Sequence, residues 1–198
     1  HINVQLGLFN GKWYQWYKDG SDDYFLQDSL QIPRDHDAWY HVVYRFDTTQ
    51  GTASDRLRCY VNGTALGQNF STIDNPSSND DIIIGTNGLV VSIGKYNFTS
   101  GGAQYCDGYS YGPETFGSTD STSGEWVPNT APSVNYGNNG FFLKFADSSN
   151  LGLDSSGNGN NLTVGGGTLI QTKDTPSNNF CKLNTQFYSP DVTISNRG

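Results

Sequence analysis

Basic residues and long apolar runs are scarce in this chain of 198 residues. Eleven Lys and Arg stand against 19 Asp and Glu, which gives a formal net charge of −8 and a pI of about 4.5. This balance disfavours nucleic-acid phosphates and anionic membrane surfaces as partners, because both require Lys and Arg. No apolar run approaches the roughly 20 residues needed to cross a bilayer. We therefore expect no nucleic acid and no membrane as partner.

Methionine is absent and cysteine is rare. The chain has no initiator and opens on His1-Ile2-Asn3 as if already inside a strand, so we expect a processed chain or a piece of a longer one. Its cysteines, Cys59, Cys106 and Cys181, include no close pair of the kind that zinc sites use. Cys59 is expected to be a small core residue, and a Cys106–Cys181 disulfide remains an open alternative. The odd count fits folding in a reducing cytoplasm better than a disulfide framework.

Glutamate occurs only twice, at Glu114 and Glu125, which bears on catalysis. A glycoside hydrolase needs two carboxylates about 5–9.5 Å apart across the scissile bond. Each glutamate lies in a Gly-, Pro- or Ser-rich loop and has no carboxylate two positions away. In the adjacent pairs Asp22-Asp23 and Asp80-Asp81, the two members of each pair would point to opposite faces of a strand.

A nucleophilic triad is not indicated either. No Gly-x-Ser-x-Gly motif accompanies His41, which we expect to pack within its strand. The sequence therefore favours a protein that is not an enzyme.

Glycine and aromatic residues are abundant instead, with 24 Gly and 14% aromatics. No window of helical length shows a 3.6-residue period with good helix formers. Strand-sized runs are separated by turn dipeptides such as Asn10-Gly11 and Asn62-Gly63, which tolerate positive φ. The predicted strands are 3–9, 13–17, 23–26, 39–46, 56–62, 81–85, 89–96 and 141–146, with weaker candidates at 161–164 and 168–171. This spacing predicts an all-β fold, an antiparallel two-sheet sandwich.

The strongest local pattern is WYHVVYRFDTTQGTASDRLRCYVNG, residues 39–63. Strand-forming residues from Trp39 to Phe46 lead into a polar turn. The residues from Arg56 to Val61 then alternate, with Leu57, Cys59 and Val61 on one face. Asn62-Gly63 closes the pattern with the dipeptide best suited to a two-residue hairpin turn.

The same stretch resembles the central hairpin of laminin-G-like (concanavalin-A-like) jelly-roll domains. In these a Trp-x-His-Val strand precedes an Asp-containing turn and a strand ending in Val-Asn-Gly. IGKYN (93–97) is similar to the Ile-Gly-Arg/Lys strand of that fold, and YCDGY (105–109) to the segment that opens its return strand. The following motifs come in the order seen in phage tail-fibre, capsid-fibre and related virion appendage proteins: PETFG (113–117), GEWVP (124–128), YGNNGFFLKFADSS (136–149), LDSSGNGNNLTV (153–164) and DTPSNNF (174–180).

One departure from that family concerns Tyr109-Ser110-Tyr111-Gly112, which leads straight into Pro113 where a further strand usually intervenes. Such a missing strand would leave a sheet edge for a neighbouring subunit to cover. The resemblance implies a virion protein assembled in the host cytoplasm, a homo-oligomer, commonly a trimer, with other virion proteins as partners.

The predicted domains are a laminin-G-like sandwich over 1–116, a polar loop over 117–139, and a C-terminal β segment over 140–198. The last either completes the sandwich or begins a following module. The expected function is either structural assembly or adhesion to a surface glycan. For adhesion, the expected partner is a host surface polysaccharide. The alternative is a polysaccharide-degrading enzyme, a glycoside hydrolase or lyase on the same fold.

Two aromatic groups are candidates for glycan binding, because sugars stack their apolar faces on rings beside Asn, Asp and Gln. In Trp13-Tyr14-Gln15-Trp16-Tyr17 alternate residues share a face, of which one must be core and the other is the candidate. Burial of both faces remains the alternative. The predicted glycan-binding residues are Trp13, Gln15, Trp16, Tyr17 and Asp22. Tyr105, Tyr109 and Tyr111 form a second group with the same two interpretations.

Calcium is the one cofactor that the sequence raises. LDSSGNGNN (153–161) places Asp154, Ser156 and Asn158 at positions 1, 3 and 5 of an EF-hand loop, with Gly159 at position 6. Position 12 is Gly165, so the closing glutamate is missing. The alternative is a tight polar turn held by side-chain-to-backbone hydrogen bonds.

Overall fold

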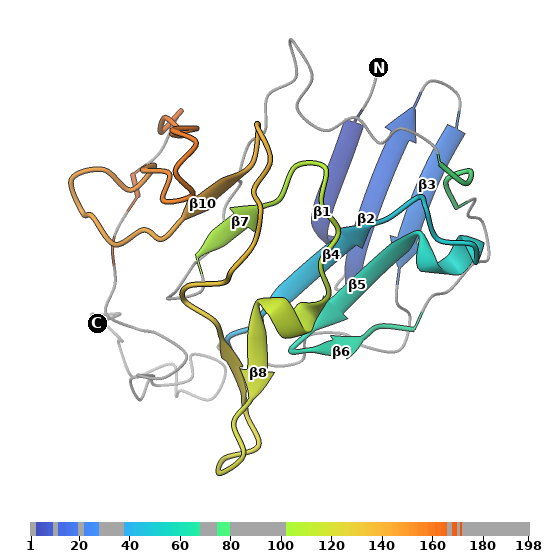
Figure 1. Cartoon of the computed structure of the whole chain (residues 1–198), viewed down its shortest axis with the longest axis horizontal. Coiled ribbons are helices and arrows are strands. Elements are labelled where there is room, and N and C mark those ends of the chain that lie inside the picture. Colours follow the sequence, from blue (N-terminus) through green and yellow to red (C-terminus); the bar gives the residue numbers. More distant parts are fainter. Residues whose placement is uncertain are drawn as a thin grey trace, which may run out of the picture.

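The computed structural model of the chain describes residues 3–9, 12–19, 22–27, 38–67, 75–79, 102–165, 168–169 and 171. Regular structure in these residues consists of β-strands and two short 3-10 helices (Figure 1). Every strand pairing among them is antiparallel. The predicted all-β fold with antiparallel sheets is thus confirmed. The predicted strands 81–85 and 89–96 lie outside the described residues.

The first sheet is formed by β1 (Asn3–Phe9), β2 (Lys12–Asp19) and β3 (Asp22–Gln27), in the order β1-β2-β3. These bounds confirm the three strands predicted at the start of the chain, each within two residues at either end. Of their side chains, the structure describes those of Leu6, Lys12 and Trp13.

The second sheet is formed by β4 (Val42–Phe46), β5 (Leu57–Val61) and β6 (Thr64–Ala65), in the order β4-β5-β6. Asn62 and Gly63 between β5 and β6 have φ of 48° and 76°, as the predicted two-residue turn requires. The strand predicted from residue 39 begins only at Val42. The Asn62 side chain accepts a hydrogen bond from the backbone N–H of His41 at 2.8 Å, just before that start.

The two sheets face each other, with β5 against β2 and β3 (Figure 1). Leu57 and Cys59 are each 1% exposed, and Leu66 is 2% exposed. Around Cys59 and Leu66 pack the partly buried side chains of Trp13, Val42, Tyr44 and Val61. Full burial of a leucine side chain contributes about 1.5–3 kcal/mol. Cys59 is thus the core residue predicted from the alternation of β5.

Cys106 is also a free thiol, and its proposed partner Cys181 lies outside the described residues.

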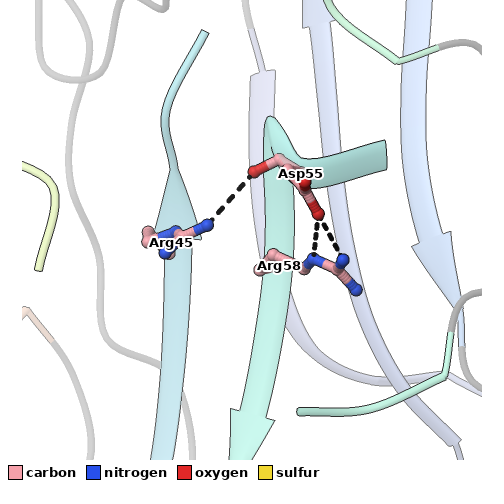
Figure 2. Close-up of polar contacts among 3 residues, drawn as sticks. All are labelled: Arg45, Asp55 and Arg58. Atoms are coloured by element: carbon pink, nitrogen blue, oxygen red, sulfur yellow. Dashed lines mark hydrogen bonds and ion pairs between the residues drawn. The ribbon is translucent and has the colours of Figure 1, made fainter. Parts of the chain in front are cut away.

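Arginines organise the loop between β4 and β5, which contains the 3-10 helix η1 (Ala53–Asp55). Arg45 and Arg58 face each other across the two strands. Figure 2 shows Asp55 joining them: its carboxylate forms an ion pair with Arg58, and its backbone oxygen accepts a hydrogen bond from Arg45 Nη2 at 3.3 Å. Arg56 donates to the backbone oxygens of Gln50 at 2.9 Å and Pro76 at 2.7 Å. All three guanidinium groups therefore contact this loop, although the buried Nε of Arg45 has no hydrogen-bond partner among the described residues.

The second half of the described chain adds two strand pairs. β7 (Ala103–Tyr105) pairs with β10 (Phe141–Leu143), and β8 (Gly117–Thr119) pairs with β9 (Trp126–Pro128). A 3-10 helix, η2 (Pro113–Thr115), precedes β8. The β8–β9 pair lies inside the stretch 117–139, which the sequence predicted as a polar loop. Phe141, Phe142 and Leu143 are 6%, 3% and 2% exposed, so β10 is fully buried.

The C-terminal strand predictions are only partly right. β10 stops at Leu143 instead of Ala146, because Phe145 takes a positive φ of 53° that ends an extended strand. The weaker candidates at 161–164 and 168–171 have no strand among their described residues. No helix of the described residues has the length and hydropathy of a membrane span.

Candidate functional site

Two tyrosines form a stacked pair in the loop between β7 and η2. The ring centroids of Tyr109 and Tyr111 lie 6.2 Å apart, with 17° between the ring planes. Tyr109 is 48% exposed, whereas Tyr111 is partly buried and meets Phe116 edge-on at 6.2 Å. One ring therefore anchors the pair and the other presents its surface to solvent.

A single asparagine holds the hydroxyl ends of both rings. Asn135 donates from Nδ2 to the Tyr109 hydroxyl at 2.7 Å and from its backbone N–H to the Tyr111 hydroxyl at 2.9 Å. Its Oδ1 accepts from the backbone N–H of Gly137 at 2.9 Å. Both phenol oxygens act as acceptors here, so each keeps a proton that it can donate. We call Tyr109, Tyr111 and Asn135 the tyrosine platform.

The loop that carries Tyr109 is tied to the chain around Asn135. Asp107 donates from its backbone N–H to Tyr136 O at 3.0 Å, and its Oδ2 accepts from Nδ2 of Asn139 at 2.9 Å. Gly137, at φ 67°, approaches so closely that a Cβ there would overlap the Asp107 carbonyl. These contacts extend the β7–β10 pairing and bring Tyr109 to Asn135.

Tyr105, the third member of the predicted tyrosine group, belongs to this support and not to the platform. Its ring lies 5.9 Å from that of Phe141, and its hydroxyl lies 3.4 Å from Asp107 Oδ1. Burial raises the pKa of Tyr105, and the neighbouring Asp107 charge raises it further.

A polar turn over residues 154–161 braces the same region. Asp154, 9% exposed, accepts from the backbone N–H groups of Phe142 and Ser156 at 2.8 Å each. Its other oxygen accepts from the Ser156 hydroxyl at 2.8 Å and the Asn160 backbone N–H at 2.9 Å. Asn158 Nδ2 then donates to the carbonyls of Gly137 at 2.7 Å and Gly140 at 2.9 Å.

This geometry supports the polar-turn interpretation of the predicted calcium loop. Burial alone would raise the pKa of Asp154, but the donors from Phe142, Ser156 and Asn160 outweigh it and hold that pKa below its ordinary value. A carboxylate offers about four lone-pair directions, and four donors use them here. No cluster of three or more His, Cys, Asp or Glu suited to a metal occurs within the described residues. Calcium binding by Asp154, Ser156 and Asn158 stays a prediction.

The two glutamates lie on different elements. Glu114 belongs to η2 and is exposed, and its carboxylate folds onto Gly112, where a Cβ would overlap it. The carboxylate therefore lies against the residue that follows Tyr111 in the sequence. Glu125 is exposed just before β9, and its backbone oxygen accepts from Asp120 N–H at 2.8 Å.

His41, immediately before β4, contacts β9, an element far from it in the sequence. Trp126 of β9 donates from Nε1 to His41 Nδ1 at 3.0 Å, and the two rings lie 5.9 Å apart. The indole covers Gly63 and Gly117, at either of which a Cβ would overlap it. Burial lowers the pKa of His41, which keeps the imidazole neutral and able to accept.

The glycan-binding residues predicted in the first sheet are described only in part. Trp13 is partly buried, packs against the Cys59–Leu66 cluster and meets Tyr40 edge-on at 5.7 Å, so it contributes to the sandwich interior. The other four have a described backbone, with Trp16 paired to Phe25 and Asp22 to Asp19. The side chains of Gln15, Trp16, Tyr17 and Asp22 lie outside the description, so their role stays a prediction.

Comparison with known proteins gives a family match. A protein-family model described as the concanavalin A-like lectin/glucanases superfamily matches residues 2–109. The matched range runs from the start of the first sheet through β7 and ends at Tyr109, the first residue of the tyrosine platform. No curated protein and no solved structure matches the chain.

Proposed function

The chain belongs to the concanavalin A-like lectin/glucanase superfamily, and from this premise we propose that it is a non-enzymatic module that binds a glycan on its tyrosine platform. The observation that carries the proposal is the stacked Tyr109–Tyr111 pair, held by Asn135 with one ring 48% exposed. An exposed aromatic face next to hydroxyl and amide groups matches a pyranose, which has apolar C–H faces and a rim of hydroxyls.

The fixed geometry of the platform also favours binding. Asn135 holds both hydroxyls, and Phe116 holds Tyr111 edge-on, before any ligand arrives. Ordering a side chain at an interface costs about 0.5–1.5 kcal/mol, and a ring that is already fixed avoids that cost. Among the described residues neither phenol proton has an acceptor, so both can be donated to sugar oxygens.

The non-enzymatic part of the proposal is supported by the carboxylates. Glu114 and Glu125 lie on η2 and on the β8–β9 hairpin, and Asp154 is engaged with four donors. The alternative, a glycoside hydrolase or lyase, predicts release of reducing ends or unsaturated products from a polysaccharide. Substitution of Glu114 or Glu125 would then stop that release.

The setting that we propose is a phage virion appendage, either a tail or a capsid fibre, in which the module adheres to a host surface polysaccharide or joins subunits of a homo-oligomer, commonly a trimer. The support is the order of motifs from YCDGY to DTPSNNF along the chain. Mass spectrometry of the intact particle or filament tests this setting, because it would identify the parent chain and its companions.

The platform is tested by Tyr109→Ala on a glycan array, followed by calorimetry with the glycans that bind. Removing the exposed ring takes away the stacking surface, and we expect affinity to fall about tenfold or more, equivalent to about 1.4 kcal/mol. Because Tyr109 is exposed, the melting temperature should change little. Tyr109→Phe, which keeps the ring, should retain most of the affinity.

Two further variants make the result decisive. Val127→Ala is the matched control, since Val127 is 47% exposed on β9 and should leave binding unchanged. Trp16→Ala tests the candidate in the first sheet. Loss of binding with Trp16→Ala and full retention with Tyr109→Ala would move the site to β2, and absence of binding to any glycan would refute the proposal.

A further inference from the structure

We propose that the ligand of the tyrosine platform is a glycan without acidic groups, and that amine-bearing glycans bind it more tightly than neutral ones. This inference rests on the proposed function and adds the charge class of the ligand. It is drawn from the charged groups around the platform.

The platform lies in a long stretch of chain without any basic residue. Residues 96–143 contain no Lys, Arg or His, and their acidic residues are Asp107, Glu114, Asp120 and Glu125. All three platform residues belong to this stretch. A carboxylate or sulfate on a bound sugar therefore finds no cationic partner in the stretch that builds the site, whereas an ammonium group meets an excess of negative charge.

Glu114 is the acidic group that we infer acts on the ligand. It is exposed, and its carboxylate lies against Gly112, the residue that follows Tyr111. Asp107 is nearer to Tyr109 in sequence, but its Oδ2 accepts two hydrogen bonds from Asn139, so it serves the framework. An ammonium group stacked on the tyrosines would interact with the aromatic face and with Glu114 together.

Four basic side chains that the structure describes outside this stretch make contacts of their own. Arg45 and Arg58 are joined through Asp55 (Figure 2), and Arg45 also lies over the Tyr60 ring at 5.8 Å. Arg56 donates to backbone carbonyls of the β4–β5 loop and of Pro76. Lys144 lies 5.1 Å from the ring of Phe142. Within the described residues 102–143, which include the whole platform, every charged side chain is acidic.

The inference is tested with oligosaccharides that differ in one substituent. Calorimetry with hexasaccharides of glucose, glucosamine and glucuronic acid, each in the linkage found on the array, should rank glucosamine first and glucuronic acid last. We expect the acidic form to bind at least tenfold more weakly than the neutral form. At 0.5 M NaCl the Debye length shrinks to about 4–5 Å, so the advantage of glucosamine should largely disappear.

Substitution of Glu114 gives the second arm. Glu114→Lys should raise affinity for the glucuronic acid form and lower it for the glucosamine form, and Glu114→Gln should bring the two closer together. Glu125→Lys makes the same change of charge on the β8–β9 hairpin and should leave the ranking unaltered. Unchanged melting temperatures would show that all three variants fold.

The possible failures can be told apart. If the glucuronic acid form binds as tightly as the neutral form, or if Glu114→Lys leaves the ranking unchanged, the inference about charge is wrong and the platform stands. If none of the three sugars binds, or if Tyr109→Ala binds them as the unaltered chain does, the proposed function itself fails.

Discussion

Asp154 links β10 to the turn that follows it. Its carboxylate accepts from the backbone of Phe142 and from Ser156 and Asn160, and it is nearly buried while doing so. Leaving a buried donor without its acceptor lowers the free energy of unfolding by about 1–3 kcal/mol. The stability of this region therefore depends strongly on the charge and shape of one side chain.

Asp154→Asn should therefore lower the free energy of unfolding by about 1–3 kcal/mol, because one oxygen becomes an NH₂ group that cannot accept. Urea denaturation followed by tyrosine and tryptophan fluorescence measures the change. Asp147→Asn is the matched control: Asp147 caps its own turn through Ser149 but is exposed, so the loss should be well below 1 kcal/mol. Equal losses in the two variants would contradict the bracing role of Asp154.

For single residues, the sequence predicted the environment of a side chain better than its hydrogen-bond partners. The alternation of β5 predicted the burial of Cys59 because strand periodicity is local. The spacing of Asp154, Ser156 and Asn158 predicted a polar loop, and only the positions of the N–H donors favour the turn over an ion site. Asn135 carried no signal at all, because it lies 24 and 26 residues from the tyrosines whose hydroxyls it binds.

Among the elements, the β8–β9 hairpin depends on a contact that crosses the fold. Trp126 donates to His41, 85 residues away in sequence, and its indole fills the space over Gly63 and Gly117. The β4–β5–β6 sheet was predictable because its pairings and the Asn62-Gly63 turn are local. The hairpin was predicted as polar loop because its strands are three residues long and its docking is set by a distant ring.

The hairpin contact gives the protein a pH dependence near neutrality. Burial holds the pKa of His41 below its ordinary value of 6.5, so the unfolded chain takes up this proton at a higher pH than the folded chain. The contribution of neutral His41 to stability is thus complete above about pH 6.5 and is lost as the pH falls through the lower pKa of the folded state. We expect the free energy of unfolding to decline over that window.

The measurement is urea denaturation between pH 5 and pH 8, with His41→Gln for comparison. The Gln side-chain oxygen can still accept from the indole but does not titrate, so this variant should show a flatter decline. Both proteins contain His1 and His36, so the comparison isolates the effect of residue 41. An identical pH slope in the two proteins would show that His41 does not govern the hairpin.

For the whole molecule, the residues after the family match are built into the part that matches. β10 supplies the partner strand of β7, Asn139 binds Asp107, and Trp126 covers the β5–β6 turn. Sequence spacing predicted the sandwich because each strand carries its own pattern and turn. It did not predict how the later residues fold back, because those contacts join segments far apart in the sequence.

A chain ending at residue 109 should therefore fail to unfold cooperatively, even though the family match lies within it. Its β7 would lose its partner strand, and Gly63 and His41 would lose their indole cover, which exposes backbone groups and apolar surface. Circular dichroism during thermal denaturation, with the full chain as reference, measures this. A sharp transition at the melting temperature of the full chain would contradict the dependence.

The position of the tyrosine platform relative to the family match has an evolutionary consequence. Tyr109 ends the matched range, and Tyr111, Glu114 and Asn135 follow it in a segment of loops and short strands. Under the proposed function, substitutions at these residues would alter which sugar is recognised and leave the strands of the first two sheets unchanged in sequence. Residues 109–135 also include Trp126, so any exchange of this segment has to preserve the indole over Gly63 and Gly117.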